Sequence, residues 1–325
     1  MAREFLGLSD GADDEKLVIT VLGRGVPDGM LARVKAVVAA HGLTVGRRCW
    51  LSGEGEPAGY SALELYARGA LRSEAEMRAE LMGLVDEFET DVAVQRESAF
   101  RCDRRLFFFD MDSTLIQGEV IDELAKMAGV GGQVVAITAS AMRGEIQFQE
   151  SFRRRVGLLK GLPVDRVYEL LDRIPLMDGA ERLFKALKGL GVKTGVLSGG
   201  FTFFGGALQG RLGIDHVFAN VLEIADGVVT GEVKSQIVDG ARKAELLKEI
   251  AAREGVALEQ VVAVGDGAND LPMLRLAGLG VAFHAKPVVR TGAAVSLSHV
   301  GLDGLLYLLG LSDGEVAGLF RAGAN

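Results

Sequence analysis

The stretch LFFFDMDSTL, residues 106–115, decides the fold. Four large apolar residues in a row are typical of a central strand in a parallel sheet that helices cover on both faces. Asp110 and Asp112 follow that strand directly, and an unpaired buried carboxylate costs far more free energy than the neighbouring apolar contacts return. Something at the end of this strand must therefore compensate for two carboxylates.

Similar apolar runs recur downstream and alternate with helix-like segments, which indicates an α/β protein with a doubly wound, Rossmann-like parallel sheet. The expected strands are residues 105–110, 192–198, 216–220, 260–266 and 279–283. More than eighty residues separate the first two strands, far more than one crossover helix needs. We therefore expect an inserted helical subdomain at about 116–177, and a final amphipathic helix at 301–310.

Residues 1–97 show a different order of elements. Strand-like segments at 16–23, 43–52, 60–69 and 90–98 alternate with helix-like segments at 27–42 and 74–88. The order βαββαβ predicts a ferredoxin-like antiparallel sheet with two helices on one face. It resembles an ACT domain, a regulatory fold that often binds amino acids and pairs between subunits. We expect a regulatory or dimerisation domain at 1–97 and a second domain at 98–325, with a packing module that binds no ligand as the alternative.

The composition excludes several classes of protein. Among 325 residues, 36 are basic and 44 acidic, and the net charge of −8 argues against a nucleic-acid surface. No apolar run approaches the roughly 18 residues of a membrane span, and the first residues lack the apolar core of a signal peptide, so a cytoplasmic protein is expected. Two cysteines, Cys49 and Cys102, are too few for a disulfide framework or a four-cysteine zinc site.

Polar residues follow three of the expected strands at the edge where open α/β sheets bind ligands. They are Asp110 and Asp112 after the first strand, Ser198, Gly199 and Gly200 after the second, and Asp266 after the fourth. Carboxylate oxygens suit Mg²⁺, and paired glycines let backbone amides approach an anion. Lys243 opens a predicted helix, where a cation is unfavourable unless an anion lies nearby. The pattern predicts a site for Mg²⁺ and an anionic substrate.

One arginine of the predicted insert belongs to an apolar helix face. Phe148, Phe152, Arg155 and Leu159 share that face at helical spacing, whereas Arg153 and Arg154 turn away from it. A planar guanidinium suits a carboxylate, so Arg155 is a candidate clamp for a substrate carboxylate, and Glu119 is a candidate partner for a substrate amine. The alternatives are a snorkelling arginine at a packing edge and an acidic residue in the first turn of a helix.

The motifs DMDST, LSGG and GDGANDLPML, together with the Lys243 helix, resemble the four motifs of the haloacid dehalogenase superfamily. With GE at 118–119 and FQESFRRRV at 148–156, residues 104–300 are similar to the phosphoserine phosphatases of that superfamily. The resemblance implies Mg²⁺-dependent hydrolysis of O-phospho-L-serine through an aspartyl-phosphate, the last step of serine biosynthesis. It also implies that the insert is a cap over the amino-acid end of the substrate.

The same resemblance implies a role for each motif residue. Asp110 is the expected nucleophile and Asp112 the expected acid and base. Mg²⁺ is expected on Asp110, on the backbone carbonyl of Asp112 and on Asp266, with Asp270 steadying the metal shell. The substrate is expected to contact Glu119, Phe148, Arg155, Ser198, Gly199, Gly200, Lys243 and Asn269.

Three alternatives stay open at this point. The enzyme could act on another small phosphomonoester or transfer the phosphoryl group to an acceptor alcohol. The chain could be a phosphate-accepting receiver module, although such modules lack a cap insert of this length. It could also be chiefly a sensor that binds L-serine or another amino acid through residues 1–97, and a homodimer is expected through that domain.

Overall fold

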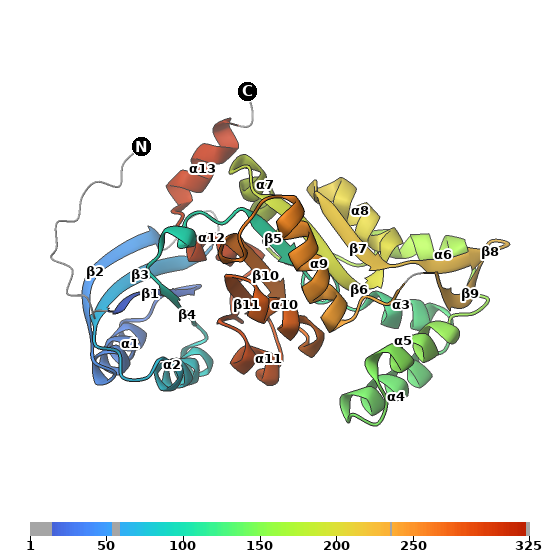
Figure 1. Ribbon diagram of the computed structural model, residues 1–325, viewed down its shortest axis with the longest axis horizontal. Coiled ribbons are helices and arrows are strands. Elements are labelled where there is room, and N and C mark those ends of the chain that lie inside the picture. The colour runs from blue at the N-terminus through green and yellow to red at the C-terminus, as the bar shows by residue number, and fades with distance from the viewer. Residues whose placement is uncertain (1–14, 54–58, 235, 323–325) are drawn as a thin grey trace.

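The computed structural model describes residues 15–53, 59–234 and 236–322, and Figure 1 shows two large sheets and a small hairpin. The first sheet consists of β1 (Glu15–Gly23), β2 (Leu43–Ser52), β3 (Ser61–Gly69) and β4 (Asp91–Arg96). These strands are antiparallel in the order β2-β3-β1-β4, which confirms the predicted βαββαβ arrangement. Helices α1 (Asp28–Ala40) and α2 (Glu74–Phe88) bury Val34, Met77 and Leu81 against one face of this sheet.

The second sheet has the parallel topology that the sequence predicts. Its strands are β5 (Leu106–Phe109), β6 (Lys193–Phe201), β7 (His216–Asn220), β10 (Val261–Gly265), β11 (Leu279–Phe283) and β12 (Val295–Leu297), in the order β12-β11-β10-β5-β6-β7. All neighbouring pairs are parallel. The fully buried β5 lies in the middle, where Phe107 pairs with Val262 on one side and Thr194 on the other. The short β12 was not predicted.

Helices cover both faces of this sheet, as a doubly wound fold requires. They are α7 (Ala180–Gly189), α8 (Thr202–Leu212), α9 (Gly240–Arg253), α10 (Leu271–Leu276), α11 (Pro287–Gly292), α12 (Leu305–Leu308) and α13 (Asp313–Ala322). Alternate residues of β5 point to opposite faces: Phe107 packs in the apolar cluster that includes α7, whereas Phe108 packs in the cluster that includes α9. The strand is therefore apolar throughout.

The expectation of a final amphipathic helix at 301–310 is wrong. That segment forms a 3-10 turn, Leu302–Gly304, followed by the four-residue α12, and the last helix is α13. The segment is buried on every side because it lies between the two sheets, where Gly301 donates to the Tyr60 hydroxyl and Gln95 donates to the Leu308 carbonyl. Burial on all sides removes the polar stripe that defines an amphipathic helix.

Residues between β5 and α7 form α3 (Val120–Met127), α4 (Gly131–Met142), α5 (Phe148–Gly157) and α6 (Val164–Glu169), at the end of the molecule far from the first sheet (Figure 1). An unpredicted hairpin, β8 (Leu222–Ala225) and β9 (Val228–Val233), braces these helices. The Gly161 amide donates to the Val229 carbonyl at 2.8 Å, and the Val164 amide donates to the Gly227 carbonyl at 2.9 Å. Within the described residues, no helix is both long and apolar enough to cross a membrane.

Candidate active site

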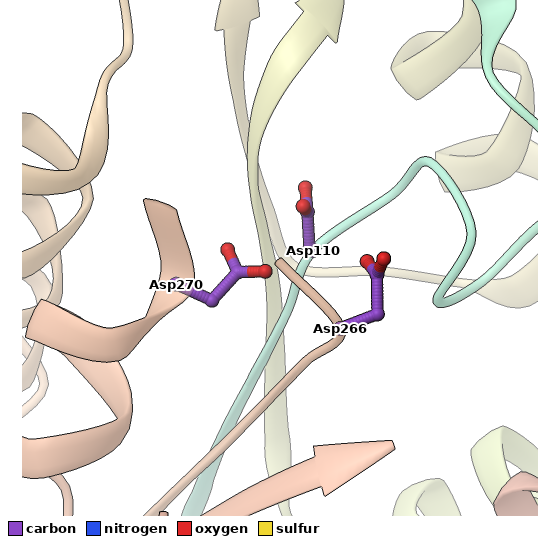
Figure 2. A group of neighbouring side chains, drawn as sticks. All are labelled: Asp110, Asp266 and Asp270. Atoms are coloured by element: carbon purple, nitrogen blue, oxygen red, sulfur yellow. The ribbon is translucent and has the colours of Figure 1, made fainter. Parts of the chain in front are cut away.

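Three carboxylates meet at the carboxyl edge of the second sheet. Asp110 follows β5 and Asp266 follows β10, and these two strands are neighbours. Asp270 comes from the 3-10 turn Ala268–Asp270 just beyond β10. Figure 2 shows the three side chains converging, and one oxygen of each lies within 4.8 Å of the others. The strand-end argument therefore predicted the position of Asp110 and Asp266 correctly.

Lys243 is the cation of this centre. Its side chain is fully buried, and its Nζ lies 2.9 Å from Asp110 Oδ1 and 2.7 Å from Asp270 Oδ1. Burial alone would lower the pKa of Lys243, but the two carboxylates outweigh that effect and raise it. Asp239 places the lysine in the first turn of α9, because its carboxylate caps the helix by accepting from the Arg242 amide at 3.0 Å.

The donor set fits a hard divalent cation. The centre has three carboxylates and one ammonium group, which pairs with Asp110 and Asp270, so negative charge remains. Burial raises the pKa of both Asp266 and Asp270 to about 7, and the charge of Asp110 adds to the effect. A cation with a preference for oxygen ligands would relieve this repulsion. The side chain of Thr114, which was not predicted, donates to Asp266 Oδ1 at 3.2 Å and fixes that carboxylate.

The carboxyl group of Asp112 lies apart from this cluster, toward α3. Its Oδ1 accepts from the Val120 amide at 3.0 Å. Burial, followed by the charges of Glu119 and Asp110, raises the pKa of Asp112 well above its usual value. Gly200 is needed beside it, since a Cβ at that position would lie 2.5 Å from Asp112 Oδ2. Burial and these two charges favour the protonated form of the carboxyl group, although the hydrogen bond from the Val120 amide opposes them.

Ser198, Gly199 and Gly200 form an irregular stretch within β6, between Leu197 and Phe201, where the register with β7 shifts. This stretch, called the glycine turn below, lies between Asp112 and the inserted helices. The buried Ser198 hydroxyl accepts from the Gly200 amide at 2.9 Å. A Cβ placed on Gly199 would lie 3.5 Å from the ring of Phe148, at the start of α5. The structure thus brings the predicted Phe148 onto the predicted glycine turn.

Glu119 and Arg155 are charged residues of the inserted segment that lie close enough to the centre to interact electrostatically with its carboxylates. Glu119 lies at the N-cap position of α3, remains open to solvent at one side, and accepts from the Ser113 hydroxyl at 3.2 Å. Crowding by protein atoms, with Asp110, raises the pKa of Glu119. Burial lowers the pKa of Arg155, while the negative charges of Glu119 and Asp122 oppose that change. The Arg155 Nε is buried and has no hydrogen-bond partner in the described residues.

The predicted helix face of the insert is confirmed. Phe152 and Leu159 are buried, while Arg153 and Arg154 are exposed. Arg154 pairs with Glu150 on the outer surface at 2.5 Å. Of the three arginines, Arg155 is thus the one that turns inward.

Asn269 is near the centre, although its side chain makes none of the hydrogen bonds that join the described site residues. It shares the 3-10 turn of Asp270, and its carbonyl packs against Gly240, where a Cβ would lie 2.6 Å away. Two residues of this region were not predicted from the sequence: Gln149, whose side-chain amide donates to Asp239 Oδ2 at 2.7 Å, and Asn220. Asn220 carries the signal used for Asp110, a polar residue at a strand end, whereas no sequence pattern marks Gln149.

Comparisons with known proteins agree with this geometry. The family model described as haloacid dehalogenase-like hydrolase matches residues 104–278. A phosphoserine phosphatase of Archaeoglobus fulgidus is 48% identical over 240 residues, which are 74% of this chain and 70% of the relative. Phosphoserine phosphatase SerB2 of Mycobacterium tuberculosis is 44% identical over 298 residues, which are 92% of this chain and 72% of the relative.

Solved structures show the same likeness across both sheets. A haloacid dehalogenase family hydrolase of Salmonella enterica superposes with a TM-score of 0.78 at 31% identity, covering 90% of this chain and 98% of its own. A probable phosphoserine phosphatase of Vibrio cholerae superposes with a TM-score of 0.70 at 32% identity, and the match covers 94% of this chain and 88% of the Vibrio chain. These matches exclude the receiver-module alternative. The chain is therefore a phosphatase of the haloacid dehalogenase-like hydrolases and belongs to the phosphoserine phosphatase family.

Proposed function

We propose that this enzyme hydrolyses O-phospho-L-serine to L-serine and inorganic phosphate, the last step of serine biosynthesis. The observation that carries the proposal is the placement of Arg155 and Glu119 beside the acidic centre that holds Lys243. A guanidinium complements the carboxylate of serine, and a carboxylate complements its amine. The names of the relatives from A. fulgidus and M. tuberculosis support the same substrate.

In the first half-reaction, a carboxylate oxygen of Asp110 attacks phosphorus and the bond from phosphorus to the serine oxygen breaks. Asp112 donates its proton to that leaving oxygen, a role that its raised pKa supports. A positioned acid of this kind typically contributes about 10²–10⁴-fold to the rate. Lys243, together with the backbone amides of the Ser198–Gly200 turn, holds the phosphoryl oxygens.

In the second half-reaction, Asp112 is the base. It takes a proton from water as the water oxygen attacks the phosphorus of the aspartyl-phosphate, and the bond between phosphorus and Asp110 breaks. Phosphate leaves, and Asp110 returns as a free carboxylate. Dividing hydrolysis into two displacements lets one carboxylate serve first as nucleophile and later as leaving group.

We further propose that Asp110, Asp266 and the backbone carbonyl of Asp112 hold Mg²⁺, with Asp270 steadying the metal shell. The oxygen-only donor set and the unbalanced negative charge support this choice. When bound, Mg²⁺ would neutralise negative charge on the phosphoryl oxygens. Asn269 and Gly200 complete the proposed substrate contacts, and Phe148 closes over the amino-acid end.

A panel of phosphomonoesters tests the proposal. With Mg²⁺ present, phosphate release from O-phospho-L-serine should exceed release from the other members, and Asp110→Asn should abolish it because the nucleophile is lost. Chelation with EDTA should abolish it as well. Preference for another phosphomonoester by orders of magnitude, or transfer to an added alcohol in place of water, would remove the serine assignment in favour of the alternative activity.

The division of the chain is also a proposal: residues 1–97 as a regulatory or dimerisation domain and 98–325 as the phosphatase domain, with the cap at about 116–177. The antiparallel sheet supports an ACT-like domain that pairs into a homodimer and binds L-serine or another amino acid. Calorimetric titration of the full chain with L-serine tests the sensor. If the Arg155→Ala variant still gives heat of binding, L-serine binds outside the active site. If it gives none, the result favours residues 1–97 as a spacer without a ligand. A cytoplasmic location stays a prediction from the sequence.

A further inference from the structure

Asn220 joins two segments of the active site that are far apart in the sequence. It ends β7, its side chain is fully buried, and it was not among the predicted metal ligands or substrate contacts. Its Nδ2 donates to the Gly199 carbonyl at 2.8 Å, while its Oδ1 accepts from the Val238 amide at 3.0 Å. A reversed amide would place donor against donor and acceptor against acceptor, so these partners fix its orientation.

The two partners of Asn220 both lead to groups that hold the phosphoryl oxygens in the proposed mechanism. Gly199 belongs to the Ser198–Gly200 turn. Val238 precedes Asp239, whose carboxylate caps α9 and whose carbonyl accepts from the Lys243 amide at 2.9 Å. The two segments touch here, since a Cβ on Gly199 would lie 3.5 Å from the Val238 carbonyl oxygen.

We propose that Asn220 is a positioning residue that fixes the glycine turn and the start of the Lys243 helix relative to each other. This inference rests on the proposed function, because it concerns the group that holds the phosphoryl oxygens. Both hydrogen bonds are to main-chain atoms of the two segments, so the side chain acts as a spacer of fixed length. A displacement of about 1 Å between groups that act together can cost on the order of 10²-fold in rate.

Two substitutions separate the two hydrogen bonds. Asn220→Leu removes both at similar volume, whereas Asn220→Asp keeps an acceptor for the Val238 amide and loses the donor to Gly199. Each variant should lower kcat/KM for O-phospho-L-serine and for p-nitrophenyl phosphate by the same factor, on the order of 10- to 100-fold. Inhibition by inorganic phosphate should weaken several-fold, because Asn220 serves the phosphoryl end that all three compounds share.

Gln95→Leu is the matched control. Gln95 is another buried amide that donates to a carbonyl, that of Leu308 at 2.9 Å, but it lies between the two sheets. The Gln95→Leu substitution should lower the melting temperature and leave phosphate inhibition unchanged. This comparison distinguishes a positioning role from an effect on overall stability. If Asn220→Leu does not fold, Asn220→Asp decides the question.

Wild-type kcat/KM and wild-type phosphate inhibition in a folded Asn220→Asp variant would overturn the inference. Unequal losses on the two substrates would overturn it too, because they would place Asn220 at the amino-acid end. Failure of the proposed function looks different. If the wild-type enzyme hydrolyses p-nitrophenyl phosphate but not O-phospho-L-serine, the assignment of phosphoserine as substrate is wrong. The role of Asn220 would still be tested by comparing phosphate inhibition in the variants and the wild type.

Discussion

At the scale of single residues, Arg155 and Arg154 are neighbours in the sequence with opposite surroundings. Arg155 turns inward with its Nε unpaired, and Arg154 pairs with Glu150 at the surface. Arg155→Ala should therefore lower kcat/KM for O-phospho-L-serine by about 10- to 100-fold, the loss of a charged hydrogen bond worth about 1.5–3 kcal/mol. For O-phosphoethanolamine, which lacks the carboxylate, kcat/KM should be the same in the variant and the wild type. Steady-state kinetics on both compounds measure the difference.

Arg154→Ala is the control for this prediction, because it removes the same side chain from the outer face of the same helix. It should leave kcat/KM for both substrates at the wild-type value. Equal losses on the two substrates in Arg155→Ala would instead show that the arginine supports the helix and does not bind a carboxylate.

The acidic centre should make the stability of the metal-free protein depend on pH, and bound metal should remove this dependence. Metal-free Asp266 and Asp270 have pKa values raised to about 7, against about 3.9 in an unfolded chain. At pH values between these two pKa values, the folded state therefore binds more protons than the unfolded chain. The free energy of unfolding consequently falls as the pH rises through 7. In EDTA the melting temperature should drop between pH 6 and pH 8, and saturating Mg²⁺ should restore it.

Asp266→Asn tests the cause of that drop. Removing one of the crowded carboxylates should raise the metal-free melting temperature at pH 8 and should weaken stabilisation by Mg²⁺. An unchanged response to Mg²⁺ in this variant would place the metal elsewhere.

Most of these residues could be predicted from the sequence because they follow strands whose ends meet at one edge. Asp110 and Asp266 were found in that way, whereas Ser198 lies within β6, which continues three residues beyond its predicted end at residue 198. The complete burial of Lys243 and its contact with Asp270 could not be predicted, since they depend on how α9 packs against the turn after β10. Gln149 was missed for the same reason: its partner is 90 residues away.

At the scale of elements, the contact of α5 with the start of α9 connects the inserted helices to the phosphatase centre. Gln149 donates to Asp239, which also caps the Lys243 helix. Gln149→Ala should raise KM for O-phospho-L-serine by about two- to tenfold, the equivalent of one hydrogen bond of about 0.5–1.5 kcal/mol, because α5 is then held less firmly against the start of α9. Gln133→Ala, at an exposed position of α4, should not change KM. Identical kinetics in the two variants would show that this contact does not contribute to substrate binding.

Strands with a continuous apolar run and helices with a clear period were predicted within a few residues, and elements with neither pattern were not. β7, β11 and α2 have the predicted bounds. β12 has only three residues, and the strands of the hairpin β8–β9 mix polar and apolar residues, so none of them shows a continuous apolar run. The glycine-rich segment 202–212 still forms α8, in part because Gly205 packs where a Cβ would lie 2.7 Å from Val217.

At the scale of the whole molecule, the first sheet is packed firmly on the second. Its helix-free face contributes Leu22 and Ala93 to the same apolar cluster as Phe107. The buried Asp91 accepts from the amides of Ser298 and His299 at 2.7 and 2.9 Å, although burial raises its pKa. No sequence pattern indicates this contact, because it joins residues about 200 positions apart.

The buried ion pair of Glu64 and Arg101 makes the stability of the two sheets interdependent. Glu64 lies on β3, Arg101 belongs to the segment that leads into β5, and both side chains are almost inaccessible to solvent. Arg101→Leu leaves an uncompensated buried carboxylate and should lower the free energy of unfolding by roughly 3–5 kcal/mol. The double variant Glu64→Leu with Arg101→Leu should be more stable than Arg101→Leu alone, because no buried charge is left unpaired. Calorimetry should show one transition in the wild type, since both sheets share one apolar cluster. Two separate transitions, or a double variant no more stable than the single one, would contradict this coupling.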